Sequence, residues 1–272
     1  MPSVLVTGAG RGIGLAITHR MSEAGWTVYA TARSESALAR LDQLHHVHAI
    51  PLDITDRPAI AALPRHLPTR LDAVVNNAGI IVSGPVEGLS IKDLSRQLDV
   101  NVVSQIAVTQ AVLPAIRAAH GRIVFMSSVS GLITTPGTGA YSASKYAIES
   151  LGDALRIELR PWKIPVSLIE PGPIRTDMWE GMLDDHDAMT AKLSQENKAL
   201  YAAHLSGSRK LLGRMQKIAA PPKRVTKAVH HALTSPRPKR RYILDTTSRV
   251  QKLAVAVTPT PVTDKLLAAV TT

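Results

Sequence analysis

Short apolar segments recur along this 272-residue chain, and each of them ends in small or polar residues. Stretches with helical periodicity, such as 94–119 and 141–159, fill the intervals between them. This alternation predicts a single-domain, doubly wound α/β fold, in which helices cover both faces of a parallel sheet. Ligands of such folds bind at the carboxyl ends of the strands. The expected strands are 4–6, 26–31, 47–52, 71–75, 122–126, 164–169 and 242–244.

The first expected strand leads into a glycine-rich turn that reads Thr-Gly-x-x-x-Gly-x-Gly over residues 7–14. A helical pattern follows directly, so the order is strand, turn and helix. Such a turn points backbone N–H groups and a helix N-terminus at a phosphate, and glycines let the backbone approach a pyrophosphate. The pattern predicts dinucleotide binding through Gly8, Gly12, Ile13 and Gly14, whereas the plainer alternative is an ordinary strand-to-helix turn.

The segment after the second expected strand bears on the choice of dinucleotide. NAD sites often carry an acidic residue here for the ribose 2′-hydroxyl, while an arginine accommodates the 2′-phosphate of NADP. The chain has Arg33 at this point and no Asp or Glu over 26–34, and Arg11 adds a second cation inside the turn. NADP(H) is therefore the expected cofactor, with NAD(H) as the alternative if Arg33 only opens the next helix in solvent.

Tyr141 and Lys145 lie four residues apart in a helical pattern, and Ser128 precedes Tyr141 by thirteen residues. Positions i and i+4 share one face of a helix. A tyrosine titrates near pH ~10, and a neighbouring cation lowers its pKa toward the range useful for proton transfer. The spacing suggests a proton donor, the residue that tunes it and a hydroxyl partner for a carbonyl oxygen. By itself, such a pair also arises by accident on solvated helix faces.

Taken together and in this order, these residues resemble the short-chain dehydrogenase/reductase family. The resemblance covers residues 2–176 strongly and the remainder in outline, and it implies a Rossmann-like fold and hydride transfer with a nicotinamide cofactor. The matching pieces are the turn at 7–14, Asn76-Asn77-Ala78-Gly79, Asn101, Ser128, Tyr141-x-x-x-Lys145 and Pro171-Gly172-x-Ile174-x-Thr176.

The resemblance also implies a role for each matching residue. Tyr141 would exchange a proton with the substrate oxygen, Lys145 would lower the pKa of Tyr141 and bind the nicotinamide ribose, and Ser128 would hold the substrate oxygen. Asn101 would interrupt its helix and position a water for proton relay. The implied cofactor contacts are Asp53 to the adenine, Asn77, Ala78 and Gly79 to the adenosine ribose, Thr176 to the carboxamide, and Pro171, Gly172 and Ile174 beside it.

By the same resemblance, the single domain of 1–272 divides into a cofactor-binding and catalytic core (1–176), a substrate lid (177–212) and a C-terminal helix, strand and tail (213–272). Met178, Trp179 and Met182 are expected to line the substrate pocket, although ordinary core contacts explain them equally well. The tail resembles that of members acting on lipophilic alcohols and ketones such as steroids and retinoids.

Composition excludes several classes of protein. The chain has no cysteine, which removes disulfides and thiol catalysis and suits a reducing cytoplasm. No signal peptide, transmembrane segment or metal-ligand spacing is expected. The net charge of +11 belongs to residues 209–241, which hold eleven Lys or Arg and no acid. Without interleaved aromatic residues, this segment suggests a solvated face or weak membrane-surface association and no nucleic-acid binding.

The sequence therefore predicts a cytoplasmic oxidoreductase, such as a carbonyl reductase, that transfers a hydride between NADP(H) and a hydrophobic alcohol or carbonyl compound. An NAD-dependent alcohol dehydrogenase of the same family is the nearer alternative. A non-catalytic dinucleotide-binding regulatory protein is the alternative of a different class. The resemblance further implies a homodimer or homotetramer formed through the helices that carry Asn101 and Tyr141.

Overall fold

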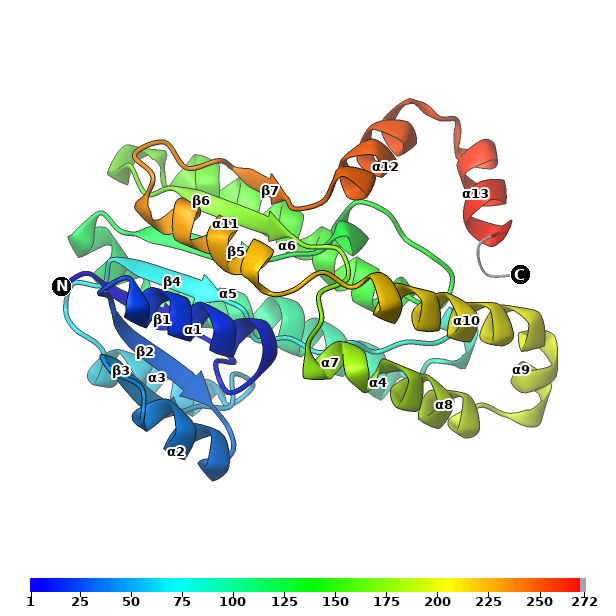
Figure 1. The fold of residues 1–272 in the computed structure, drawn as a ribbon, viewed down its shortest axis with the longest axis horizontal. Coiled ribbons are helices and arrows are strands. Elements are labelled where there is room, and N and C mark those ends of the chain that lie inside the picture. The colour runs from blue at the N-terminus through cyan, green and yellow to red at the C-terminus, as the bar shows by residue number, and fades with distance from the viewer. Residues whose placement is uncertain (270–272) are drawn as a thin grey trace.

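The computed structural model describes residues 1–269, apart from the side chains of Met178, Trp179, Thr247, Gln251, Val255 and Ala256. Within this part of the chain, seven strands form one parallel sheet in the order β3-β2-β1-β4-β5-β6-β7 (Figure 1). This confirms the predicted doubly wound α/β class. The strands are β1 Ser3–Val6, β2 Thr27–Ala32, β3 Val47–Pro51, β4 Ala73–Asn76, β5 Arg122–Met126, β6 Val166–Glu170 and β7 Arg241–Ile243.

Helices cover both faces of the sheet. On one face α1, α2 and α11 pack into a first hydrophobic cluster, and on the other α3, α5 and α6 pack into a second. The helices are α1 Gly12–Glu23, α2 Glu35–Asp42, α3 Arg57–Ala62, α4 Ile91–Leu98, α5 Ser104–Ala119, α6 Gly139–Glu158, α7 Asp177–Glu180, α8 Met182–Lys192, α9 Gln195–Leu200, α10 Ala202–Ile218, α11 Lys223–Thr234, α12 Thr246–Val257 and α13 Thr260–Ala269.

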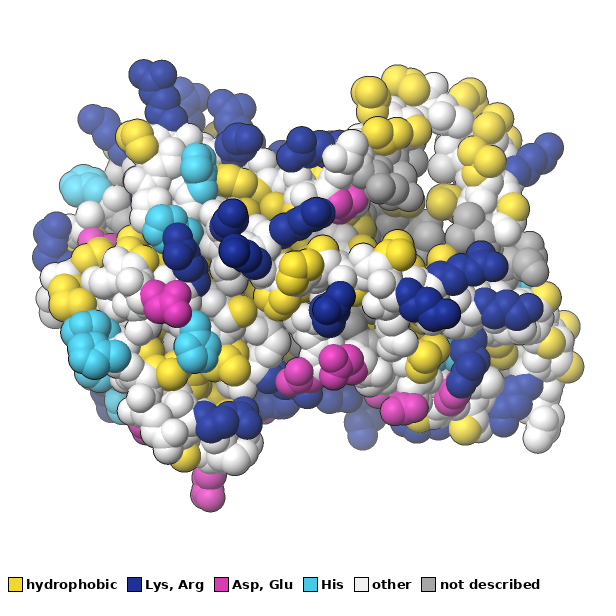
Figure 2. Space-filling view, in the orientation of Figure 1, with side chains coloured by type: hydrophobic (Ala, Val, Ile, Leu, Met, Phe, Trp, Pro, Cys, Tyr) yellow, Lys and Arg dark blue, Asp and Glu magenta, His cyan; other side chains and the backbone are white. Residues whose placement is uncertain are grey.

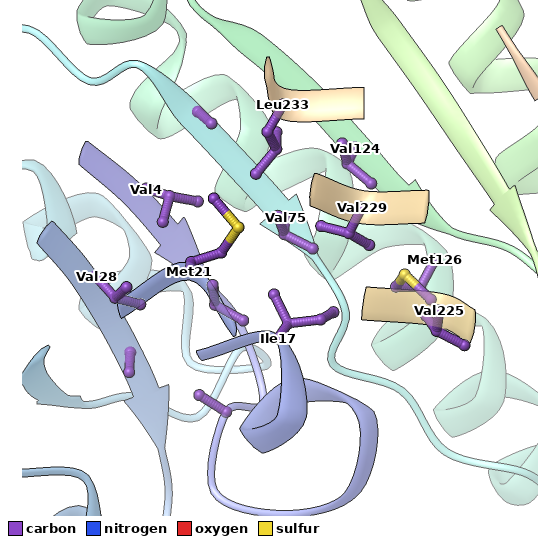
Figure 3. Close-up of a cluster of buried hydrophobic side chains, with 14 of the residues drawn as sticks. Val4, Ile17, Met21, Val28, Val75, Val124, Met126, Val225, Val229 and Leu233 are labelled. Carbon is purple, nitrogen blue, oxygen red and sulfur yellow. The ribbon is translucent and has the colours of Figure 1, made fainter. Parts of the chain in front are cut away.

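The strands read as continuous apolar runs because successive side chains enter opposite clusters. On β1, Val4 and Val6 belong to the first cluster and Leu5 to the second. Figure 3 shows the first cluster, where Ile17 and Met21 of α1 lie over the strands. Burying one such side chain fully stabilises the fold by about 1.5–3 kcal/mol. The two helical layers therefore hold the strands in one sheet, and the carboxyl ends of those strands position the site.

The predicted helix 94–119 is interrupted at Asn101, as the resemblance implied. It divides into α4, a wide turn over Asp99–Val103 with π-helical hydrogen bonding, and α5. The whole stretch Ile91–Ala119 is long and apolar enough to cross a membrane by length and composition. Its buried side chains include Gln97, Asn101 and Gln105, which hydrogen-bond to the loop that follows β4. This pattern is typical of a core helix beside a functional site.

Beyond β6, four helices extend from the carboxyl edge of the sheet. α8 and α10 run side by side and are joined by α9, as Figure 1 shows. The substrate lid was expected at 177–212, and α10 continues past its boundary to Ile218. The chain then returns to the sheet through α11 and β7, and α12 and α13 form the tail expected after the last strand.

The basic segment 209–241 does not form one face. Figure 2 shows Lys and Arg side chains along α10, where Arg209 pairs with Asp187 at 2.8 Å. At the other end of the segment, Arg241 is directed inward and pairs with Glu149 at 2.9 Å. Part of the segment that was expected to be a solvated face therefore makes ion pairs. One joins α10 to α8 in the lid, and the other joins β7 to α6.

Candidate active site

A cavity of about 1460 Å³ opens at the carboxyl ends of the strands. It runs from the glycine-rich turn and the start of α2, past the ends of β4, β5 and β6, to the helices of the lid. Its lining includes every residue that the sequence assigned to the cofactor or to catalysis: Gly8, Arg11, Gly12, Ile13, Gly14, Arg33, Asp53, Asn77, Ala78, Gly79, Asn101, Ser128, Tyr141, Lys145, Pro171, Gly172, Ile174 and Thr176.

The glycine-rich turn has the geometry of an anion site. Gly12 has a φ of +56°, in the left-handed region that favours glycine. A Cβ on Gly14 would lie 2.2 Å from the Gly8 carbonyl oxygen, so only glycine fits where α1 packs on the turn. No described side chain caps α1, and its first turn holds no acidic residue. Its first N–H groups are therefore available to a phosphate.

Asn77 has a structural task beside any contact with a ribose. Its Nδ2 donates to the carbonyl oxygens of Thr7 at 2.9 Å and Gly8 at 3.3 Å, and its backbone N–H donates to the Thr7 hydroxyl at 3.0 Å. These bonds tie the end of β4 to the turn after β1. The turn is therefore held in shape by the neighbouring strand.

Three arginines surround the end of the cavity at the start of α2. Arg33 lies 3.8 Å from Asp53, and Arg40 donates to the Gly10 carbonyl oxygen at 3.0 Å, with Arg11 on the turn opposite. Asp53 is oriented by Thr55, whose backbone N–H donates to it at 2.9 Å and, as the largest effect, lowers the pKa of that carboxyl. The sequence analysis missed Arg40, which the helical period of α2 brings to the turn.

Asn101 sits in the wide turn between α4 and α5 and is fully buried. Its Oδ1 accepts from the Ile80 N–H at 2.8 Å, and its Nδ2 donates to the Ile80 carbonyl oxygen at 2.9 Å. The interruption of the helix is the one expected at this residue. Gln97, which the sequence analysis missed, makes a matching pair of bonds to Val82 and Ile80 one turn earlier.

Tyr141 and Lys145 lie on one face of α6, as their spacing predicted. The Lys145 ammonium lies 5.5 Å from the centre of the Tyr141 ring and donates to the Met126 carbonyl oxygen at 2.7 Å. Ser128 follows the end of β5 and hydrogen-bonds to the Tyr141 hydroxyl. Of the neighbouring serines, Ser144 instead donates to the Tyr141 carbonyl oxygen at 2.6 Å.

The electrostatics of this pair differ from the sequence-based expectation. Burial raises the pKa of Tyr141, and the hydrogen bond to Ser128 opposes this effect. Burial also lowers the pKa of Lys145 to about 8, against the opposing charge of Glu149. Burial is the largest cause of both shifts, and the ammonium is directed at the Met126 carbonyl oxygen. The phenol therefore keeps its proton at neutral pH, as a proton donor to a carbonyl oxygen requires.

The lid supplies the apolar end of the cavity. Met182 lines it as expected, together with Met189, Leu205, Leu211, Leu212 and Met215. The side chains of Met178 and Trp179, the other two expected substrate contacts, lie outside the described residues. Polar contacts also hold the lid: the Tyr201 hydroxyl donates to Glu87 at 2.7 Å, and the buried His186 lies 3.2 Å from the Ser208 hydroxyl.

Comparisons with known proteins agree with this geometry. The family described as "short chain dehydrogenase" matches residues 2–187. The chain is 36% identical to the uncharacterized oxidoreductase YbbO of Escherichia coli (97% of this chain, 93% of that protein). It is 29% identical to an NADPH-dependent 3-dehydrocapnine reductase of Ornithobacterium rhinotracheale (98% and 96%) and 31% identical to mouse retinol dehydrogenase 5 (97% and 87%).

Solved structures share the fold. A short-chain dehydrogenase from Streptomyces avermitilis superposes with a TM-score of 0.78 at 30% identity, over 94% of this chain and 92% of that one. The strand order, the glycine-rich turn and the Tyr141–Lys145 pair agree with these likenesses. The chain belongs to the short-chain dehydrogenase/reductase family and is an NAD(P)-dependent oxidoreductase acting on CH–OH or C=O groups.

Proposed function

We propose that this protein transfers a hydride between NADP(H) and a hydrophobic alcohol or carbonyl compound of lipid-like character. One observation carries the proposal. The cavity that begins at the glycine-rich turn ends against apolar lid residues, and Tyr141, Ser128 and Lys145 lie on its wall between those two ends. A nicotinamide cofactor and an apolar substrate would therefore meet at an acid/base pair.

The residues present fit a dinucleotide. The uncapped start of α1 would take the pyrophosphate, and the cavity continues from there to Thr176 and Lys145. When bound, the nicotinamide supplies the hydride chemistry. Tyr141 donates its hydroxyl proton to the substrate oxygen in reduction or accepts one in oxidation. Ser128 holds the same oxygen by its hydroxyl, and Lys145 holds positive charge beside the phenol.

The preference for NADP(H) over NAD(H) is supported by charge. Arg11, Arg33 and Arg40 line the end of the cavity where the adenosine would lie, and Asp53 is the acid beside them. Ser34 adds a hydroxyl at the start of α2. A guanidinium fork suits the 2′-phosphate, whereas an NAD site more often presents a carboxylate to the ribose. The NADPH-dependent relative supports the same choice.

The apolar lid supports the substrate class. Flexible methionine side chains at Met182, Met189 and Met215 adapt to irregular ligands, and aliphatic leucines complete the wall. Retinol dehydrogenase 5, a relative that matches nearly the whole chain, is named for a lipophilic alcohol. We propose long-chain, terpenoid or steroid-like alcohols and ketones.

Two measurements test the proposal. Binding titrations should give NADPH an affinity at least about tenfold higher than NADH, which corresponds to one charge-assisted contact of about 1.4 kcal/mol. A spectrophotometric screen with NADPH should show kcat/KM increasing with the apolar length of a ketone series. Tighter binding of NADH, or a preference for small polar ketones, would contradict the proposal.

A further inference from the structure

A cluster of charged side chains lies behind Lys145 and does not line the cavity. It brings together Glu149 and Asp153 of α6, Glu170 at the end of β6 and Arg241 at the start of β7. The Arg241 guanidinium reaches Asp153 at 2.7 Å, Glu149 at 2.9 Å and Glu170 at 3.3 Å. The Arg241 guanidinium therefore contacts all three carboxyl groups, and Arg156 adds a second cation at Asp153.

The hydrogen bonds do not satisfy these carboxyl groups equally. Asp153 accepts from the Nη2 of Arg241 and from Arg156, and the hydrogen bond from Arg241 is the largest cause that lowers the pKa of Asp153, so it stays ionised. Glu149 and Glu170 both approach the Nε of Arg241, which carries a single hydrogen. That hydrogen bonds to Glu149 Oε2. Among the described groups, none donates a hydrogen bond to either oxygen of Glu170 or to Glu149 Oε1.

Burial makes this arrangement costly if both glutamates are ionised. Glu170 is fully buried and Glu149 is 7% exposed. A buried carboxylate without hydrogen-bond donors loses its bonds to water and makes no hydrogen bonds that replace them. A proton on Glu170 removes one of two like charges from this buried site. Burial, as the largest cause, and the charges of Glu149 and Asp153 on α6 raise the pKa of Glu170 to about 7, whereas Lys252 on α12 and Arg241 on β7 oppose this effect.

The pair is connected to the catalytic lysine. Glu149 follows Lys145 by four residues on α6, so the two share one face of that helix. A Cβ on Gly131 would lie 3.1 Å from Glu149 Cγ and 3.2 Å from the Lys145 carbonyl carbon. The loop that begins at Ser128 therefore packs against both residues. Burial lowers the pKa of Lys145 to about 8, and the charge of Glu149 opposes that effect.

We propose that Glu170 holds a proton in the folded protein, and that the negative charge of Glu149 behind Lys145 holds its ammonium protonated for catalysis. Both are positioning residues, because they act on Tyr141 only through Lys145. The proton on Glu170 removes the second of the two buried glutamate charges. The part of the proposal that concerns turnover rests on the proposed function, whereas the protonation of Glu170 does not.

The proton on Glu170 predicts how stability depends on pH. Glu170 has a folded-state pKa of about 7, above its ordinary value of 4.5. The folded state therefore binds a proton that the unfolded state has lost between these values, and the stabilisation it provides is complete below about pH 4.5 and lost as pH rises through about 7. Glu170→Gln, which keeps the size of the side chain and cannot ionise, should remove this dependence.

The first experiment measures the proton directly. Infrared difference spectra of the wild-type protein at pH 6 should show the carbonyl stretch of a neutral carboxylic acid, and the band should fade as pH rises through 7. Glu170→Gln should lack the band, and its melting temperature should change less between pH 5 and 8. Glu158→Gln, an exposed glutamate on the same helix, is the matched control and should behave like the wild type. A wild-type spectrum without the band, or equal pH dependence of melting in the two variants, would overturn the protonation of Glu170.

The second experiment measures the link to Lys145. Lysines carrying a ¹³C label at Cε are titrated by NMR, with the Lys145 signal assigned by its loss in Lys145→Met. Glu149→Gln should move the Lys145 midpoint to lower pH, and Glu149→Asp should restore it. An unchanged midpoint in Glu149→Gln would overturn the role of the pair. Because this readout needs no substrate, it stands apart from a failure of the proposed reaction. Once a substrate is known, the alkaline limb of kcat/KM should move in the same direction.

Discussion

The two ends of the cavity are built in different ways. At the cofactor end, backbone groups and buried polar side chains shape the wall, as when Asn77 ties the turn at Gly8 to the end of β4. At the lid end, mainly apolar side chains from α8 and α10 form the wall beside His186, His204 and Ser208, and exposed polar pairs such as Tyr201–Glu87 hold it. Backbone packing tolerates few substitutions, whereas a wall of flexible methionines tolerates many. The cofactor end is therefore expected to be rigid, and the lid to determine which substrate enters.

The largest effect is expected at Tyr141, between the two ends of the cavity. There, loss of turnover should be separable from loss of cofactor affinity. Tyr141→Phe removes only a hydroxyl, and we expect kcat to fall by about 10³-fold because general acid catalysis contributes about 10² to 10⁴. NADPH affinity should change by less than about threefold, since the ring is retained. Stopped-flow turnover and fluorescence titration measure the two effects. Near-normal turnover would refute the role of Tyr141.

A pair of glycine substitutions tests rigidity. Gly14→Ala would place a Cβ 2.2 Å from the Gly8 carbonyl oxygen, and we expect a loss of about 1–3 kcal/mol in unfolding free energy together with weaker NADPH binding. Gly213→Ala on α10 is the matched control, because a Cβ there meets no described atom within 4 Å. It should stabilise α10 by up to about 1 kcal/mol. Equal effects of the two changes in denaturant titrations would contradict the comparison.

The arginines at the cofactor end offer a more selective change. Arg33→Ala should weaken NADPH binding by about tenfold, because one charge-assisted contact is lost, and should leave NADH binding nearly unchanged. Calorimetric titration with both cofactors measures the ratio. Arg237→Ala serves as the control, because Arg237 is an exposed arginine of the basic segment 209–241. A parallel loss of affinity for both cofactors would argue against a 2′-phosphate contact.

The smallest expected effect belongs to the lid. Tyr201→Phe removes the hydrogen bond to Glu87, which is exposed and contributes about 0.5–1.5 kcal/mol. We expect KM for an apolar ketone to rise by about two- to tenfold, with NADPH affinity unchanged. Glu87→Gln retains an acceptor for the same hydroxyl and should show a smaller effect. A change in cofactor affinity as large as the change in KM would mean that the two ends are coupled.

Sequence alone predicted the features that depend on local spacing. The turn at 7–14 and the Tyr141–Lys145 pair follow from periodicity along one helix or one turn, and the structure brings both to the cavity. The contacts it could not predict join distant segments. Arg40 reaches Gly10, Gln97 reaches Ser144, and Glu170 meets Arg241, each across an interval that only the fold closes.

The same limit explains why the pKa of Tyr141 is raised, whereas the sequence predicted that Lys145 would lower it. Spacing places a cation near the Tyr141 phenol, but it does not say how far both are removed from water. Burial raises the pKa of Tyr141 because the apolar surroundings disfavour phenolate. The break in the helix at Asn101 was expected from resemblance, and its bounds became clear only with the hydrogen bonds to Ile80.

The two borders of the sheet bear on how the protein behaves at high concentration. β3 forms one border and ends at Pro51, which has no N–H to offer another chain. β7 forms the other border, and it is three residues long. Short or proline-ended borders give a neighbouring molecule few free backbone groups to pair with. Molecules of this protein should therefore resist edge-to-edge association of their sheets, even though the central strands are rich in valine.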